Sequence, residues 1–241
     1  AGGLQQTEVD GRLLRVGEAV DRFYVLENNG IYLSDAEVPV KDGKKMTVNG
    51  VELKAGDPKW GDRNGDNKIT DEDKVLKGHS LPKYTGGFST QLKFKRFDLG
   101  ASFFFAAGQS AMNYRAYQQY DFTTLDKGDN LAGVKEIFFW QSGNVPMDYP
   151  RYNVLSGVHP YRADQDLYLE KVSYLKLRSV TLGYSVPTPK HDVYVYVSGN
   201  NLFTVSNFSG DDPELVDFDG YYRGYGMGIP RSVTLGVRCS F

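Results

Sequence analysis

The residues best suited to bind a ligand form an acidic segment, Asp62-Arg-Asn-Gly-Asp-Asn-Lys-Ile-Thr-Asp-Glu-Asp73. Counted from its first residue, oxygen-bearing side chains stand at positions 1, 3, 5 and 12, and position 7 can offer its backbone carbonyl; these residues are Asp62, Asn64, Asp66, Asp73 and Lys68. This is the register of an EF-hand-type loop, in which hard oxygen ligands converge on Ca²⁺. The segment therefore predicts a metal site with Ca²⁺ as its cofactor.

The same segment departs from the calcium pattern in two places. Asn67 stands at position 6, where glycine is usual, although asparagine tolerates a left-handed backbone better than most residues. Asp73 stands at position 12, where its short arm reaches the ion through one oxygen, and the flanking residues do not have a helical pattern. A metal-free turn, satisfied by hydrogen bonds from side chain to backbone, fits these residues equally well. Both interpretations stay open at this point.

No other group of residues has a catalytic or metal-binding spacing. The one cysteine, Cys239, excludes an intrachain disulfide framework and a cysteine-based zinc site. The three histidines, His79, His159 and His191, are far apart in the sequence. No Gly-x-Ser-x-Gly, His-Glu-x-x-His or phosphate-loop motif occurs, so we expect no enzymatic activity. The formal net charge of −2 argues against nucleic-acid binding, which needs a basic surface.

The strongest structural pattern is at the end of the chain, where residues 231–241 alternate between polar and apolar side chains. The apolar positions are Val233, Leu235, Val237, Cys239 and Phe241. A period of two predicts a β-strand whose two faces meet different surroundings. About ten such residues are long enough to cross a bilayer when the strand is tilted by roughly 45°.

Similar alternation predicts four more strands upstream. Residues 88–95 and 97–105 form a tight hairpin around Arg96, residues 168–185 form a strand with a phase slip near Arg178 and Ser179, and residues 192–203 follow a turn at 187–190. Two long polar connections, 106–166 and 204–230, alternate with these short turns. That regular alternation is typical of an all-β, transmembrane antiparallel β-barrel with long extracellular loops.

The amino-terminal third has a different pattern. Its apolar pieces are too short to span a membrane and are broken by turn signals such as Asn28-Asn-Gly30. We therefore predict that residues 1–84 are an extracellular loop region, with the calcium-like loop and part of one strand near 7–14, and that residues 85–241 are barrel strands and loops. The chain starts at Ala1 without an apolar leader, which favours a mature or excised piece. No stretch approaches eighteen apolar residues, so no transmembrane helix is predicted.

Taken together, the motifs resemble the carboxy-terminal part of the SusC/RagA family of TonB-dependent outer-membrane transporters, from about Val16 to Phe241. The motifs that carry the resemblance are, in order, Phe23-Tyr24, Asn29-Gly-Ile-Tyr32, Gly56-Asp57, Asp62-x-Asn-Gly-Asp66, Pro82-Lys-Tyr-Thr-Gly-Gly-Phe88, Phe97-Asp-Leu99, Ser173-Tyr-Leu-Lys-Leu-Arg-Ser-Val-Thr-Leu-Gly-Tyr184, Val197-Ser-Gly-Asn-Asn-Leu-Phe-Thr204, Asp212-Pro-Glu214 and Pro230-Arg-Ser-Val-Thr-Leu-Gly236.

The resemblance implies a fold and a function that the residues alone do not give. Members of this family form a barrel of about twenty-two strands around an amino-terminal plug. They pair with a SusD-like surface lipoprotein and import oligosaccharides or peptides with energy from the TonB complex. We therefore expect a multi-pass protein of the cell outer membrane, in which this chain supplies the last strands, either as a portion of a longer transporter or as one of several chains that share a barrel.

Two groups of site residues follow from this interpretation. Tyrosines in the long loops could stack on sugar faces or peptide groups, or could simply stiffen the loops and pack on the lipoprotein; they are Tyr114, Tyr117, Tyr120, Tyr221, Tyr222 and Tyr225. The terminal aromatic, Phe241, corresponds to the assembly signal of the family. A second hypothesis is a soluble, calcium-stabilised β-sandwich that binds carbohydrate at the cell surface, which detergent-free solubility would favour.

Overall fold

The computed structural model describes residues 5–9, 12–120, 140–141, 149–151, 157–189 and 191–240. In this part of the chain the regular secondary structure is mostly β-strand, with one short α-helix, α1 (Tyr114–Tyr120). The chain divides into two compact units, which are described separately. Unit 1 comprises Ala1–Gly78 and Met112–Leu169, and unit 2 comprises His79–Ala111 and Glu170–Phe241. Among the described residues, no helix has the length and apolar character needed to span a membrane.

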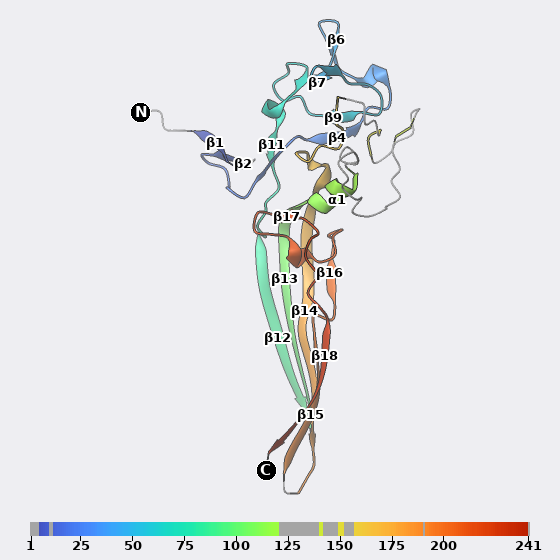
Figure 1. Ribbon diagram of the computed structural model, residues 1–241. Helices are drawn as coiled ribbons and strands as arrows, with labels where there is room; N and C mark the ends of the chain where they lie inside the picture. Colours follow the sequence, from blue (N-terminus) through green and yellow to red (C-terminus); the bar gives the residue numbers. More distant parts are fainter. Residues whose placement is uncertain are drawn as a thin grey trace. The chain divides into compact units, whose positions relative to one another are not determined.

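Unit 2 is built on one sheet of long strands in the order β12-β13-β14-β15-β18 (Figure 1). The strands are β12 (Tyr84–Phe94), β13 (Phe97–Asn113), β14 (Leu169–Val186), β15 (Asp192–Asn200) and β18 (Ser232–Ser240). Two short strands join it, because β16 (Thr204–Ser206) pairs with β14 and β17 (Tyr221–Tyr222) pairs with β13. All five long strands are predicted by the alternation of side chains, and two of them extend further than that alternation indicates: β12 begins four residues earlier and β13 ends eight residues later.

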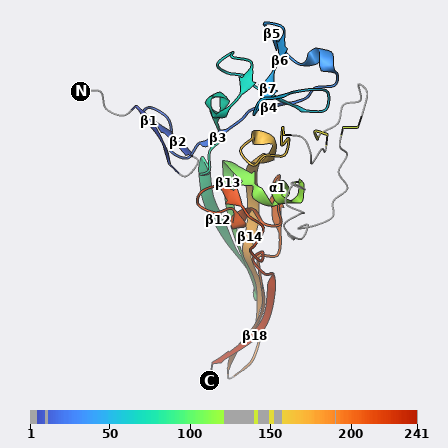
Figure 2. The same ribbon diagram turned by 45° about the horizontal axis from the view of Figure 1, so that its top comes forward.

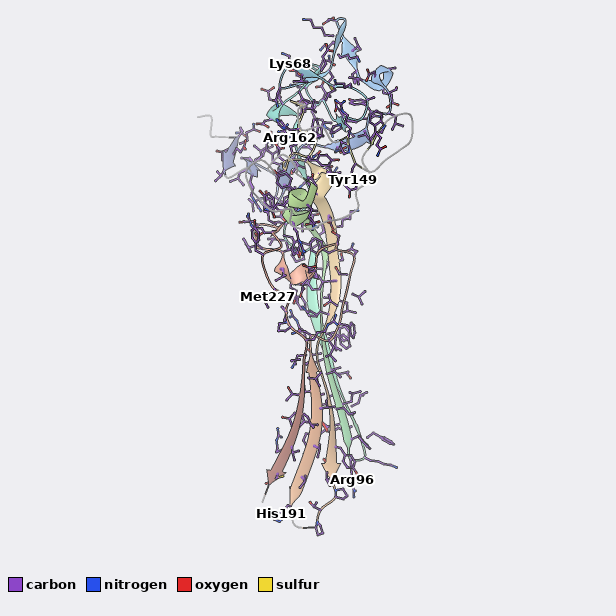
Figure 3. All side chains as sticks on the ribbon, turned by 45° about the vertical axis from the view of Figure 1, so that its right-hand side comes forward. Lys68, Arg96, Tyr149, Arg162, His191 and Met227 are labelled. Carbon is purple, nitrogen blue, oxygen red and sulfur yellow. The ribbon has the colours of Figure 1, made fainter. Side chains whose placement is uncertain are left out.

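The long strands are joined by short turns at one end of the sheet. Phe94 pairs with Phe97 across a two-residue turn, in which Lys95 adopts a positive φ of 55°. The prediction of a single turn residue, Arg96, is therefore one residue too short. Arg96 and His191, which lie in the two turns, are at the same end of the sheet (Figure 3).

β14 changes the face onto which its alternate side chains point. Tyr184 contacts Phe97 with ring centres 4.7 Å apart, whereas Arg178 lies 5.0 Å from the ring centre of Phe104. β13 pairs with β12 without interruption over this stretch, so Phe97 and Phe104 lie on opposite faces of β13. A regular strand would place Arg178 and Tyr184 on one face, because they are an even number of residues apart. The predicted phase slip near Arg178 is therefore confirmed.

Unit 1 consists of small sheets with strands of two to four residues. β1 (Gln6–Val9) pairs with β2 (Arg12–Arg15), β3 (Phe23–Val25) with β11 (Val75–Lys77), β4 (Asn28–Ile31) with β9 (Pro58–Trp60) and β5 (Val40–Lys41) with β6 (Lys44–Lys45), and β7 (Thr47–Val48) lies between β8 (Val51–Glu52) and β10 (Lys68–Ile69). Four 3-10 turns complete the elements of the two units: η1 (Asp35–Glu37), η2 (Asp71–Asp73), η4 (Asp166–Tyr168) and η5 (Pro213–Leu215). Figure 2 shows β4 to β7 grouped together.

The core of unit 1 is formed by residues of these small strands and of the segments between them. It includes Leu26, Val48, Leu53, Ile69 and Val158, all of them nearly inaccessible to solvent. Burial of these side chains, rather than long strand ladders, accounts for the order of this unit, since sheets of two short strands are at best marginally stable alone.

Candidate functional site

The alternation of side chains gives the sheet of unit 2 one apolar face and one polar face. The apolar face carries Phe88, Leu92, Phe94, Phe97, Leu99, Leu182, Val197, Val233, Leu235 and Val237, each of them at least 36% exposed. Direct strand pairing places Leu182, Val197 and Leu235 in one row across three strands. A continuous array of exposed apolar side chains is typical of a surface that contacts a membrane or another protein.

The opposite, polar face is organised around Tyr194. Its hydroxyl donates to the Asp98 carboxylate, with oxygen distances of 2.7 and 2.8 Å to the two carboxylate atoms. To reach Asp98 on β13 from β15, the ring crosses β14 at Gly183, where a Cβ atom would overlap the phenol. Tyr196 covers Gly236 on β18 in the same way. Glycine on one strand thus leaves room for a tyrosine from the next.

Basic side chains surround this tyrosine pair. Arg238 lies 6.0 Å from the ring centre of Tyr194, within reach of a cation–π contact. Lys93, Lys95 and Arg96 line the same hollow of about 700 Å³, which is at the end of the sheet that carries the short turns (Figure 3). The polar face therefore carries more basic than acidic side chains around this hollow. A sequence signal for it exists, because Asp98 and Arg238 each interrupt the apolar alternation of their strand with a charge. That both contact Tyr194 is not readable from the sequence.

The structure divides the predicted tyrosines between the two units. In unit 1, α1 brings Tyr114 and Tyr117 together with ring centres 5.0 Å apart, and Tyr117 contacts Tyr168 at 5.7 Å. The side chain of Tyr120 lies outside what the structure describes. These contacts make the α1 tyrosines part of one aromatic cluster.

In unit 2 the three remaining tyrosines differ in exposure. Tyr222 is 1% exposed, packs edge-on against Phe208 and hydrogen-bonds Asp211, so it is a core residue of its loop. Tyr221 lies beside Arg223, with the guanidinium 5.3 Å from the ring centre. Tyr225 is 77% exposed. Of these three, Tyr225 is the one whose ring is most open to a ligand.

The acidic segment satisfies its carboxylates internally. Asp62 accepts hydrogen bonds from the backbone nitrogens of Gly65 and Asn67 at 2.7 and 2.8 Å, and Asp66 accepts from Lys68 at 2.8 Å. Asn67 has a φ of 66°, the left-handed conformation expected at position 6. These bonds fit the metal-free turn.

The last carboxylate of the segment is also engaged. Asp73 is fully buried and accepts from the backbone nitrogens of Arg63 and Thr70, each at 2.8 Å. In the described part of the chain, no three acidic, histidine or cysteine side chains converge in a metal-binding geometry. Calcium binding by this segment stays a prediction, and so does the assembly role of Phe241, which lies outside the described residues.

A charged cluster links the end of the acidic segment to Arg162 and Asp164, which are also in unit 1. The Lys74 ammonium lies 2.9 Å from both Asp71 and Asp164, and Arg162 also pairs with Asp164. Burial raises the pKa of the Asp164 carboxyl, but the hydrogen bonds from Arg162 and Lys74 outweigh it and hold the pKa below 3.8. The pKa of Lys74 is raised, because its bonds to Asp71 and Asp164 outweigh the opposing effect of burial.

Comparison with known proteins gives relatives of one kind. The chain is 29% identical over 211 residues to TonB-dependent receptor P3 of Formosa agariphila, which covers 84% of this chain and 19% of that protein. It is 27% identical over 195 residues to TonB-dependent receptor SusC of Bacteroides thetaiotaomicron, which covers 75% of this chain and 17% of that protein. No protein-family model matches. The chain thus spans about a fifth of the length of these relatives.

Solved structures agree in fold. The structure of the RagAB peptide importer in the 'open-open' state superposes with a TM-score of 0.68 at 20% identity, covering 99% of this chain and 24% of that one. The 'closed-closed' state of the same importer gives a TM-score of 0.61 at 18% identity. The sequence relatives and the shared fold confirm the resemblance of this chain to the SusC/RagA family of TonB-dependent receptors.

Proposed function

We propose that the protein containing this chain is an outer-membrane active transporter, and that unit 2 forms part of the wall of its barrel. The observation that carries the proposal is the two-faced sheet. Its exposed apolar face suits contact with lipid, and its charged face suits a water-filled interior, as in barrels of the outer membrane. The names of the relatives, which are receptors and an importer, support transport rather than catalysis.

The sheet must be completed by other strands of the transporter. β12 and β18 each have one neighbour in the described sheet, so each leaves an edge of unpaired backbone groups. Such edges cannot persist in lipid, because an unsatisfied backbone group is costly there. We propose that further strands close a barrel of about twenty-two strands around a plug, and that the plug side contacts TonB.

The partner and cargo are proposed from the family. A SusD-like surface lipoprotein would cover the end that carries the long loops, and the cargo would be an oligosaccharide or a peptide. The solved relative is named a peptide importer, which supports the peptide class for that protein. Exposed aromatic side chains such as Tyr225 suit either cargo, because rings stack on sugar faces and on peptide groups.

A soluble β-sandwich would need a different arrangement. It would bury the apolar face against a second sheet about 10 Å away. In the part of the chain that the structure describes, Leu235 is 76% exposed and Phe94 is 70% exposed, so no second sheet covers them. This favours the transporter over the sandwich.

Fractionation and uptake test the proposal. The full protein should stay in the outer-membrane fraction after a carbonate wash. Deletion of its gene should abolish growth on one member of a panel of oligosaccharides and peptides, and removal of TonB should have the same effect. A protein released by the wash, or growth on the whole panel without it, would contradict the proposal.

A further inference from the structure

The connection between β16 and β18, residues 207–231, is folded onto the sheet of unit 2 and is called the latched loop below. Phe208 and Tyr222 from this loop pack against Ala111 and Val172 from the long strands β13 and β14. The loop also contains η5, whose first turn is capped by Asp212. This is a packed element with its own apolar anchor.

A buried ion cluster fixes the loop to β14. The Lys176 ammonium lies 3.2 Å from Asp212 and 2.5 Å from Glu214, and the lysine side chain is 2% exposed. Arg178, two residues further along β14, also pairs with Glu214. Two carboxylates from the loop thus neutralise two cations from the strand.

Asp212 ties three parts of the structure together. One of its oxygens accepts from the backbone nitrogen of Glu214 at 3.0 Å, and the other accepts from Lys176 and, at 3.4 Å, from the backbone nitrogen of Ile229. The capped turn, the strand and the returning chain therefore meet at one carboxylate.

The latched loop lies on the polar face of the sheet. The guanidinium of Arg178, which binds Glu214, lies over the ring of Phe104. Phe104 is on the same face of β13 as Asp98, because the two are an even number of residues apart in a regular strand. Asp98 in turn binds Tyr194 on the polar face. Glu214 and the loop that carries it are therefore on the polar side.

We infer that the latched loop narrows the interior path of the transporter and limits the size of what can pass along the polar face. This inference rests on the proposed function, in which the polar face lines the barrel interior. A buried ion pair is seldom more stabilising than apolar packing, but breaking one partner leaves an uncompensated buried charge. The cluster is therefore a sensitive point at which one substitution releases the loop.

The test measures access to a thiol on the polar face, just beyond the loop. Thr181 is on this face, since it lines the same hollow as Tyr194 and Arg238. In the full protein carrying Thr181→Cys and Cys239→Ser, displayed on intact cells, a small maleimide and a large polyethylene-glycol maleimide are compared. We expect the small reagent to label the introduced thiol and the large one to be excluded.

Release of the loop should change this ratio. Lys176→Met should raise labelling by the large reagent relative to the small one by about tenfold, because local opening of the loop exposes the path. Lys171→Met is the matched control, an exposed lysine on the same strand, and should leave the ratio unchanged. If Lys176→Met lowers the amount of assembled protein, Asp212→Asn, which keeps the side-chain size, should give the same increase.

Two results would overturn the inference. One is equal labelling by both reagents in the parent protein. The other is an unchanged ratio in Lys176→Met although trypsin now cuts the loop after Arg223. Either result, in a protein that remains in the membrane and supports uptake, would leave the proposed function standing. A protein released from the membrane would instead contradict the function itself.

Discussion

Gly183 and Tyr194 form the most constrained residue pair of the polar face. The phenol of Tyr194 occupies the space that a Cβ atom on Gly183 would fill, and its hydroxyl donates to Asp98. The glycine therefore allows this side chain of β15 to reach β13 across β14. Such a pair fixes the lateral register of three strands, because any shift would drive the ring into a side chain.

Adding one methyl group tests this pair. Gly183→Ala should destabilise the assembled protein by about 1–3 kcal/mol, the usual cost of overpacking. Gly100→Ala is the control, since a Cβ there meets no atom within 4 Å. Thermal unfolding of the purified protein, followed by its shift on a gel, measures both. Equal melting temperatures for the two variants would show that the ring moves aside freely.

Asp164 gives unit 1 a defined dependence on pH. Its pKa is below the ordinary value of 3.8, so its unfolded state binds a proton more readily than its folded state. The stabilisation is therefore complete at neutral pH and is lost as the pH falls below about 4. We expect residues 158–168 to lose protection from hydrogen exchange in that range, after correction for the intrinsic rate.

A conservative variant isolates this carboxyl. Asp164→Asn should show lower protection at neutral pH and a weaker loss on acidification, because the charge that attracts Lys74 and Arg162 is already absent. The same acid dependence in the variant and the parent would assign the effect to other groups.

At the scale of elements, the acidic segment 62–73 is either a calcium-binding loop or a metal-free turn. If it binds calcium, Ca²⁺ should slow hydrogen exchange in residues 62–73, whereas Mg²⁺ should not. A structure with Ca²⁺ bound should show six or more oxygens at about 2.3–2.6 Å from the ion. Asp66→Asn keeps an oxygen to accept the Lys68 bond but removes a ligand charge, so it should abolish the effect of Ca²⁺. Identical exchange with and without Ca²⁺ would leave the turn alone.

The long strands could be predicted from the sequence, because alternation records which side chains share a face. Even the phase slip in β14 is visible in the change of parity between Leu177 and Leu182. The ion cluster of Lys176 with Asp212 and Glu214 could not be predicted. It joins residues 36 and 38 positions apart, and a lysine in a strand gives no sign of the loop that will cover it.

The tyrosines show the same limit. Tyr221, Tyr222 and Tyr225 are close in the sequence and have the same chemistry, yet Tyr222 is 1% exposed and Tyr225 is 77% exposed. Tertiary packing of the loop against Phe208 decides which ring is buried. Composition alone therefore indicates that aromatic residues are available to a cargo, but not which ones.

At the scale of the whole molecule, the proposed function depends on what surrounds each face of the sheet of unit 2. The chain spans about a fifth of the length of its sequence relatives. The proposed function places lipid against the face that carries Leu235 and water against the face that carries Thr234. Adjacent residues on β18 therefore experience opposite surroundings.

Arginine substitutions at these two neighbours test that claim most directly. An arginine on the lipid side near the membrane midplane costs about 2–4 kcal/mol, whereas a polar interior tolerates it. The amount of folded full protein in the outer membrane, measured by its heat-dependent shift on a gel, is the readout. We predict that Leu235→Arg strongly lowers this amount and that Thr234→Arg, whose side chain would lie beside Ser198, leaves it near that of the parent. Equal amounts of the two variants would contradict the assignment of the faces and, with it, the placement of this sheet in a membrane.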